Sequence, residues 1–242
     1  MTTQQLMSYV RSACEHYDMI QPGDRIAVGI SGGKDSLSLL CALANMRRFY
    51  PKSYELEAIT VSLGFPGTDF SPVEEFCTRL GVGYTVVDSN IGPLVFEERK
   101  EKNSCSLCSK MRKGVLNGEA KRLGCNKIAY GHNRDDVIET LFMALFYEGR
   151  IHSFSPVSYL SRADVTLIRP LIFTPESSIR NYVRENKITV VKSPCPANGE
   201  TKRADMKEFV KEQRRLYPYF DEKIFSAVQN SKIEGWSKSL EA

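Results

Sequence analysis

A chain of 242 residues in which 42% are hydrophobic can bury one sizeable core, which excludes a disordered chain and suits one domain with an appendage or a small second domain. No apolar segment approaches the about 18 residues that span a bilayer, and none resembles a secretory signal, so we expect a cytosolic protein without a membrane partner. The net charge of +4 alone does not indicate nucleic acid, but residues 97–127 hold nine Lys or Arg against four Glu. Such a segment is typical of a surface that binds phosphate backbones, and a solvated helix face has the same composition.

Strand-like and helix-like segments alternate from the N-terminus to Gly149. Apolar residues at helical spacing predict a helix over 4–17, which ends before a turn at 21–24. A strand over 25–30, a helix over 36–49 and a strand over 56–61 then form a βαβ unit, whose strands pair in parallel. The predicted elements that follow are a helix over 72–80, a strand over 84–87, a helix over 108–123, a strand over 127–130 and a helix over 135–147.

The pattern changes after Gly149, where a loop rich in Ser and Pro precedes further elements. These are a strand over 165–168, a helix over 175–186, a strand over 188–191 and helical sequence from 204 onward. The alternation predicts an α/β fold with a doubly wound parallel sheet and a helical C-terminal appendage, whose ligands bind outside the carboxyl ends of the strands. We divide the chain into an N-terminal helix over 1–22, an α/β domain over 23–192, and a Pro-Cys loop with a helical segment over 193–242.

The segment between the first predicted strand and its helix reads Ser31-Gly32-Gly33-Lys34-Asp35-Ser36. Two glycines let the backbone curl around an anion, and the start of the following helix adds unpaired N–H groups. The two serines add hydroxyl donors, Lys34 supplies a cation for phosphate, and Asp35 supplies a carboxylate that suits Mg²⁺ beside a pyrophosphate leaving group. The spacing differs from the Walker A motif, which disfavours a kinase or GTPase. The alternative is a plain Gly-rich turn with a Ser cap.

This hexapeptide resembles the PP-loop of the ATP pyrophosphatase superfamily, whose members have an adenine nucleotide alpha hydrolase-like fold, release pyrophosphate and adenylate a substrate. A second segment, Gly131-His132-Asn133-Arg134-Asp135-Asp136 followed by Glu139-Thr140, resembles the GH-x-x-DD-x-x-ET motif of tRNA-modifying members. The resemblance implies ATP as co-substrate, bound by the hexapeptide and by Gly131, His132, Asp135 and Asp136, with Thr60 and Val61 near the adenine. His132 has a second interpretation, a buried structural imidazole.

Seven cysteines, an odd number, in a chain without an export signal disfavour a disulfide framework. Cys105-Ser106-Leu107-Cys108 places two thiols one helical turn apart, within reach of one metal centre. A redox dithiol, half of a zinc site and two uninvolved cysteines are the alternatives. Cys195 lies between two prolines in a loop, where a buried structural cysteine is rare. The other four lie among apolar neighbours and are expected in the core: Cys14, Cys41, Cys77 and Cys125.

The order of the motifs extends the resemblance over nearly all of the chain. The CxxC, Lys110-Met111-Arg112, the GHNRDD segment, Arg169-Pro170-Leu171 and the Pro-Cys loop are similar to the tRNA 2-thiocytidine synthetase group, with archaeal-type 2-thiouridine enzymes close by. That group implies a 4Fe-4S cluster on Cys105, Cys108 and Cys195, which leaves one iron without a protein ligand and able to bind sulfide. The sequence departs from the group at Cys195-Pro196-Ala197-Asn198, where a second CxxC is usual. The departure weakens any mechanism that uses a persulfide there.

The resulting hypothesis is ATP-dependent tRNA thiolation, in which the C2 oxygen of a pyrimidine attacks the α-phosphate and sulfide then replaces AMP. Mg²⁺ and Lys34 stabilise the departing pyrophosphate, and Asp35 and Asp136 organise metal or phosphate, so these three residues are the predicted catalytic set. Arg112, Lys113 and Arg122 are the predicted tRNA contacts, and each has an ordinary solvated side chain as its alternative.

A cysteine desulfurase or free sulfide is the expected sulfur donor, and homodimers are common in the group that the chain resembles. Three other functions compete with tRNA thiolation. They are a lysidine-synthetase-like ligase, a non-catalytic RNA-binding protein with a structural metal, and an enzyme that thiolates a small molecule.

Overall fold

A computed structural model describes residues 1–99, 104–191, 195 and 202–236 of the chain. In these residues a six-stranded sheet has the order β3-β2-β1-β4-β6-β5. Neighbouring strands pair in parallel from β3 to β6, and β5 pairs with β6 in the antiparallel direction. The predicted α/β class with a mostly parallel sheet is confirmed. The strands are β1 (Asp24–Gly29), β2 (Tyr54–Val61), β3 (Gly83–Val87), β4 (Lys127–Ala129), β5 (Val157–Leu160) and β6 (Val165–Ile168).

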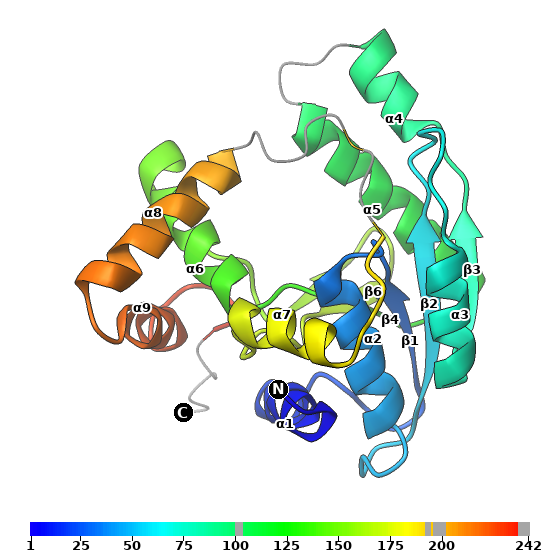
Figure 1. Ribbon diagram of the computed structural model, residues 1–242, viewed down its shortest axis with the longest axis horizontal. Coiled ribbons are helices and arrows are strands. Elements are labelled where there is room, and N and C mark those ends of the chain that lie inside the picture. Colours follow the sequence, from blue (N-terminus) through cyan, green and yellow to red (C-terminus); the bar gives the residue numbers. More distant parts are fainter. Residues whose placement is uncertain (100–103, 192–194, 196–201, 237–242) are drawn as a thin grey trace.

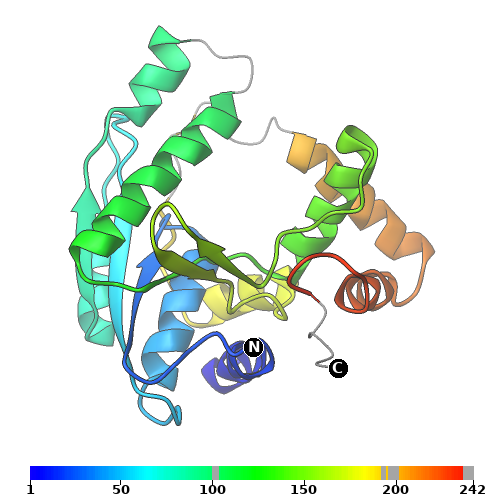
Figure 2. The same ribbon diagram turned by 180° about the vertical axis from the view of Figure 1, so that it is seen from behind.

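Helices cover both faces of the sheet (Figures 1 and 2). One face carries α1 (Thr3–His16), α2 (Lys34–Met46), α3 (Ser71–Leu80) and α7 (Glu176–Glu185), and the other carries α5 (Ser104–Arg122). Successive residues of a strand point to opposite faces, so Ile26 and Val28 join one core cluster whereas Ala27 joins the second, with Leu116 of α5. The central strands β1 and β4 are therefore buried on both sides, whereas the edge strands β3 and β5 are partly exposed.

Apart from α7, the helices beyond β4 form a group beside the sheet: α6 (Arg134–Met143), its π-helical continuation η2 (Ala144–Glu148), α8 (Lys202–Leu216) and α9 (Phe220–Gln229) (Figure 1). Aromatic rings join them, since Phe142 of α6 lies 5.3 Å from Phe209 of α8 and 5.9 Å from Phe220 of α9 between ring centroids. Farther on, the buried Trp236 donates its indole N–H to the Phe154 carbonyl at 3.1 Å. The helical C-terminal segment is thus packed against the rest of the molecule.

The N-terminal helix is set by a reciprocal cap, in which the Thr2 hydroxyl accepts from Gln5 N–H and the Gln5 side chain accepts from Thr2 N–H. Its Leu6 and Val10 are fully buried in the same core cluster as residues of α2 and α9. The division of the chain at residues 22 and 192 stays a prediction. Among the described helices, none combines the length and the apolar composition that a membrane span requires.

The predicted strand over 188–191 is wrong, because this apolar segment joins no strand. Instead the Val191 N–H donates to the Gly32 carbonyl at 3.0 Å, so the segment covers the glycine loop. Two elements were not predicted. The short edge strand β5 lies in the segment rich in Ser and Pro, and the helical residues α4 (Ile91–Pro93) and η1 (Leu94–Glu98) precede the CxxC. In addition, α5 begins at Ser104, so both CxxC thiols lie on the helix itself.

Candidate nucleotide and thiol site

The loop after β1 closes through hydroxyl contacts. Ser31 N–H donates to Ser36 Oγ at 3.2 Å, and the Ser36 hydroxyl donates to the Gly33 carbonyl at 3.0 Å. Gly32 has φ +76°, and a Cβ at this position would come within 2.8 Å of the Val191 Cβ, so both conformation and space require glycine. No side chain caps α2, which leaves its first N–H groups available to an anion.

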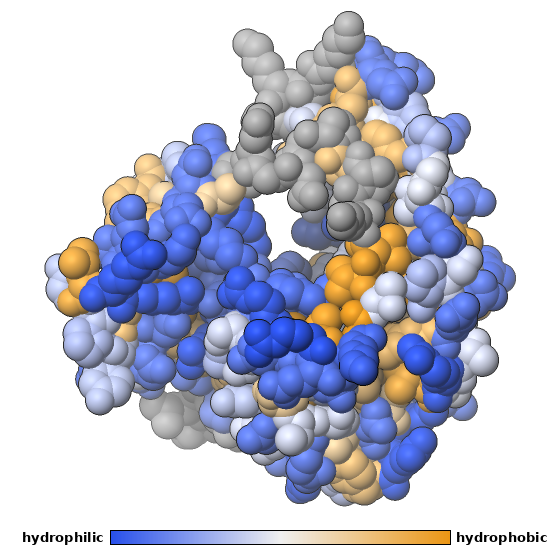
Figure 3. Space-filling view, in the orientation of Figure 1, coloured by the Kyte–Doolittle hydropathy of each residue, from blue (hydrophilic) through white to orange (hydrophobic). Residues whose placement is uncertain are grey.

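A cavity of about 860 Å³ lies at the carboxyl ends of β1, β2 and β4. The order of the sheet changes direction between β1 and β4, and such a switch point is where α/β folds bind ligands. Figure 3 shows the molecule hollowed beside α8, whose surface is hydrophilic. The predicted residues that line this cavity are Ser31, Gly33, Asp35, Ser36, Thr60, Val61, Cys105, Arg112, Lys113, Gly131 and His132. The sequence therefore predicted much of the wall of one cavity.

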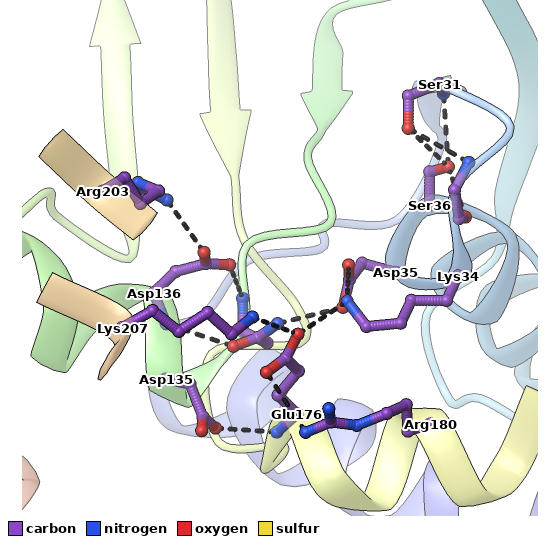
Figure 4. Close-up of polar contacts among 12 residues, drawn as sticks. Ser31, Lys34, Asp35, Ser36, Asp135, Asp136, Glu176, Arg180, Arg203 and Lys207 are labelled. Atoms are coloured by element: carbon purple, nitrogen blue, oxygen red, sulfur yellow. Dashed lines mark hydrogen bonds and ion pairs between the residues drawn. The ribbon is translucent and has the colours of Figure 1, made fainter. Parts of the chain in front are cut away.

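Lys34 is held by two carboxylates (Figure 4) and is not among the residues that line the cavity. Its Nζ lies 2.6 Å from Asp35 Oδ2 and 2.9 Å from Glu176 Oε1. Burial lowers the pKa of Lys34, but the charges and hydrogen bonds of Asp35 and Glu176 outweigh burial and raise the pKa overall. Asn133 donates its side-chain amide to Asp35 Oδ1 at 2.9 Å, which ties the GHNRDD segment to the PP-loop hexapeptide.

The two aspartates at the start of α6 have different surroundings (Figure 4). Asp136 accepts from Asn133 N–H at 2.9 Å and pairs with Arg203 of α8 at 2.9 Å. Burial raises the pKa of Asp136, and Arg203 only partly opposes that shift. The carboxylate of Asp135 accepts from Glu176 N–H at 2.7 Å and lies 2.5 Å from Arg214. Asp135 thus joins α6, α7 and α8, and neither aspartate lines the cavity.

His132 lines the cavity as a half-buried ring between aromatic neighbours. Its ring centroid lies 4.8 Å from that of Phe154 and 5.7 Å from that of Tyr130. Burial, followed by the charge of Arg169, lowers the pKa of His132 to about 3, so the imidazole is neutral at pH 7. Its Nδ1 has no hydrogen-bond partner in the part of the chain that the structure describes.

The three predicted cluster ligands differ in exposure. Cys105 is exposed and lines the cavity, Cys108 is buried one turn further along α5, and Cys195 is partly buried. Burial raises the pKa of the Cys108 thiol, and the charge of Arg112 opposes this shift. Cys195 and Cys105 add to the increase, so both lie within electrostatic range of Cys108. The described residues nevertheless contain no group of three His, Cys, Asp or Glu arranged to hold a metal. The neighbouring positions 192–194 and 196–201 lie outside the described residues.

The remaining cysteines are buried, as predicted, and have no place in this site. Burial raises the pKa of all four thiols, to about 11 for Cys77 and Cys125, which disfavours the reactive thiolate form. Arg122 also lies away from the cavity, and its Nη2 pairs with Glu119 Oε1 at 2.7 Å on the exposed surface of α5.

Several site residues were not predicted from the sequence. Asn133 belongs to the GHNRDD motif and Arg169 to the Arg-Pro-Leu motif, but the motifs alone assign neither residue a role in the site. Glu176, Arg203 and Lys207 had no local signal, because they join the site through ion pairs with segments far away in the chain. Only the tertiary structure shows these residues.

The sequence profile of the PP-loop domain family matches residues 3–213 of this chain. A tRNA-cytidine(32) 2-sulfurtransferase of Geotalea uraniireducens (strain Rf4) is 36% identical over 224 residues, which cover 91% of this chain and 89% of the relative. A protein of the same name from Pasteurella multocida (strain Pm70) is 36% identical, and the matched region covers 91% of this chain and 71% of that relative. Among solved structures, the U34-tRNA thiolase NcsA from Methanococcus maripaludis with its 4Fe-4S cluster has a TM-score of 0.77 at 25% identity, covering 93% of this chain and 76% of that chain.

Proposed function

Because this chain belongs to the PP-loop family and to its tRNA 2-sulfurtransferase group, we propose that it exchanges the C2 oxygen of a pyrimidine in tRNA for sulfur with consumption of ATP. The relatives named for cytidine 32 are more similar in sequence than the thiolase named for uridine 34, which favours cytidine 32 as the target. The observation that carries the proposal is the cavity that Ser31 and Gly33 of the PP-loop share with Cys105 of the CxxC.

The PP-loop end of the cavity suits adenylation. The C2 oxygen attacks the α-phosphate, the bond from that phosphorus to the bridging oxygen breaks, and pyrophosphate leaves toward the loop N–H groups and Lys34. Asp35 and Asp136 would hold Mg²⁺, which supplies positive charge to the phosphates when bound. Carboxylate oxygens fit this ion, and Asp35 lines the cavity. Asp136 would bind it only in place of its pair with Arg203.

Cys105, Cys108 and Cys195 would hold a 4Fe-4S cluster, which supplies an iron able to carry sulfide when bound. The donor chemistry fits, since thiolates are the usual ligands, although Cys108 shares its core cluster with Cys125 and only Cys105 is exposed. Three thiols leave one iron without a protein ligand. We keep a cysteine desulfurase or free sulfide as the source of sulfur, and a homodimer and a cytosolic location as further parts of the proposal.

Arg112 and Lys113 would hold the tRNA backbone while the target base leaves its stack and enters the cavity. Both line the cavity one turn beyond Cys108 on α5. Arg122 contacts a phosphate in this proposal only after its surface pair with Glu119 opens. Such exposed pairs contribute about 0–1 kcal/mol, so opening it is not a large obstacle.

The decisive experiment is mass spectrometry of tRNA nucleosides from a strain that lacks the gene. We expect 2-thiocytidine to disappear and to return with the wild-type gene but not with Lys34→Met. An unchanged nucleoside profile contradicts tRNA thiolation. Pyrophosphate release from ATP, Mg²⁺ and tRNA separates the enzyme from a non-catalytic RNA-binding protein, and iron with acid-labile sulfide after anaerobic purification separates it from a lysidine-synthetase-like ligase.

A further inference from the structure

Arg169, which directly follows β6, lines the cavity as a buried cation. It is 7% exposed, its Nη1 donates to the Ser155 carbonyl, and its guanidinium carbon lies 4.8 Å from the centroid of the Phe154 ring. Its Nε is buried without a hydrogen-bond partner among the described residues. A buried charge without an ionic partner is unfavourable, so an anion in the cavity would stabilise this guanidinium.

Two further cations accompany Arg169 on the cavity wall. Arg112 and Lys113 of α5 line the same cavity, and Arg169 and Arg112 lower the pKa of Lys113 after burial does so. The three charges therefore lie within electrostatic range of one another. Throughout the described ranges, no Asp or Glu forms an ion pair with any of the three.

The cations near the PP-loop differ in this respect. Lys34 is paired with Asp35 and Glu176, and Arg203 is paired with Asp136. Among the described residues that line the cavity, the cations without an ionic partner are therefore Arg112, Lys113 and Arg169. Because β6 lies two strands from β1 and adjacent strands are about 4.8 Å apart, Arg169 lies on the order of 10 Å from the strand that leads into the PP-loop.

We propose that Arg112, Lys113 and Arg169 form a second phosphate subsite, which binds a phosphate group other than the departing pyrophosphate. The assignment of partners rests on the proposed function. Two sources share this chemistry: the phosphodiester beside the target nucleotide, and the α-phosphate of ATP. The planar guanidinium of Arg169 suits bidentate contact with either, and Lys113 adds a point charge.

The test measures binding to Arg169→Gln without any turnover. Binding of unmodified tRNA is measured by fluorescence anisotropy at several salt concentrations, and binding of the α,β-methylene analogue of ATP with Mg²⁺ is measured by calorimetry. If the phosphodiester occupies the subsite, tRNA affinity falls about tenfold and the salt slope falls by about 1. If the α-phosphate occupies it, the analogue binds about tenfold more weakly while tRNA binding is unchanged. Unchanged affinity for both overturns the subsite.

Two further variants make the result interpretable. Arg11→Gln removes an arginine that pairs with Glu15 on the surface of α1, and it should bind both ligands as the wild type does. If Arg169→Gln does not fold, the same measurements are made on Lys113→Gln, because Lys113 is exposed and its replacement should not prevent folding. The two proposals can fail separately. If the cavity variants bind more weakly but tRNA from the strain without the gene still contains 2-thiocytidine, the subsite is supported and the proposed function is contradicted.

Discussion

Glu176 is a buried carboxylate that holds two lysines of the site, Lys34 and Lys207. Its Oε1 accepts from Lys34 at 2.9 Å and from Lys207 at 2.7 Å, and its side chain is 7% exposed. Burial raises the pKa of Glu176, but hydrogen bonds and charges of Lys207 and Lys34 outweigh burial and lower the pKa to about 2. The carboxylate is therefore ionised at neutral pH, and two ammonium groups share it. A phosphate at the loop would give Lys34 a further anion.

Glu176→Gln should lower the melting temperature, because it removes the anion that Lys34 and Lys207 share, at a loss of about 2 kcal/mol. Lys34 keeps its pair with Asp35. The Mg²⁺ complex of the α,β-methylene analogue of ATP should then raise the melting temperature more in the variant than in the wild type, since a phosphate replaces the lost charge beside Lys34. Differential scanning fluorimetry with and without the analogue measures both effects. Glu208→Gln, which breaks an exposed pair with Lys211, is the matched control. Equal gains in variant and wild type would show that the phosphate does not reach Lys34.

At the scale of elements, α8 contacts the site through cations on one side of the helix. Arg203 pairs with Asp136, Lys207 with Glu176 and Arg214 with Asp135. Their spacing of four and seven residues places them on one helical face, whereas the opposite face carries exposed charges. Ion pairs thus join α8 to the starts of α6 and α7. The cavity is therefore partly built by a segment that sequence patterns describe only as a charged helix, since Arg203 lines it.

Arg214→Met should destabilise the protein by about 3 kcal/mol, because Asp135 then keeps its buried charge without a cationic partner. The guanidinium also pairs with Asp221 at 2.8 Å, so α9 loses a contact with α8 as well. Arg215→Met is a close control, since the neighbouring arginine is exposed and its loss should change stability by less than about 0.5 kcal/mol. Urea unfolding monitored by circular dichroism compares the two. Equal midpoints would contradict a structural role for the pair with Asp135.

At the scale of the whole molecule, the sequence predicts the parts of the site that are contiguous in the chain. The PP-loop and the Gly131-His132 pair follow adjacent parallel strands, so the apolar strand pattern alone brings them to one edge of the sheet. Ion pairs such as Lys34 with Glu176 have no local signature, since they depend on how α7 packs beside α2. The wrong strand over 188–191 has the same origin, because β-branched residues that cover a loop have the same apolar pattern as residues that join a sheet.

At the same scale, the proposed sulfur chemistry requires thiols from two distant segments to meet, Cys105 and Cys108 of α5 and Cys195 of the Pro-Cys loop. Cys195→Ala should abolish retention of iron and acid-labile sulfide after anaerobic purification, because two cysteines on α5 cannot hold a 4Fe-4S cluster alone. Cys14→Ala removes a thiol that is 1% exposed in the core and should keep iron and sulfide at wild-type levels, with a small loss of stability. Iron and sulfide per chain, together with the visible absorbance of the cluster, measure the outcome. Equal retention in the two variants would remove Cys195 from the ligand set, and with it the link between the Pro-Cys loop and the cavity.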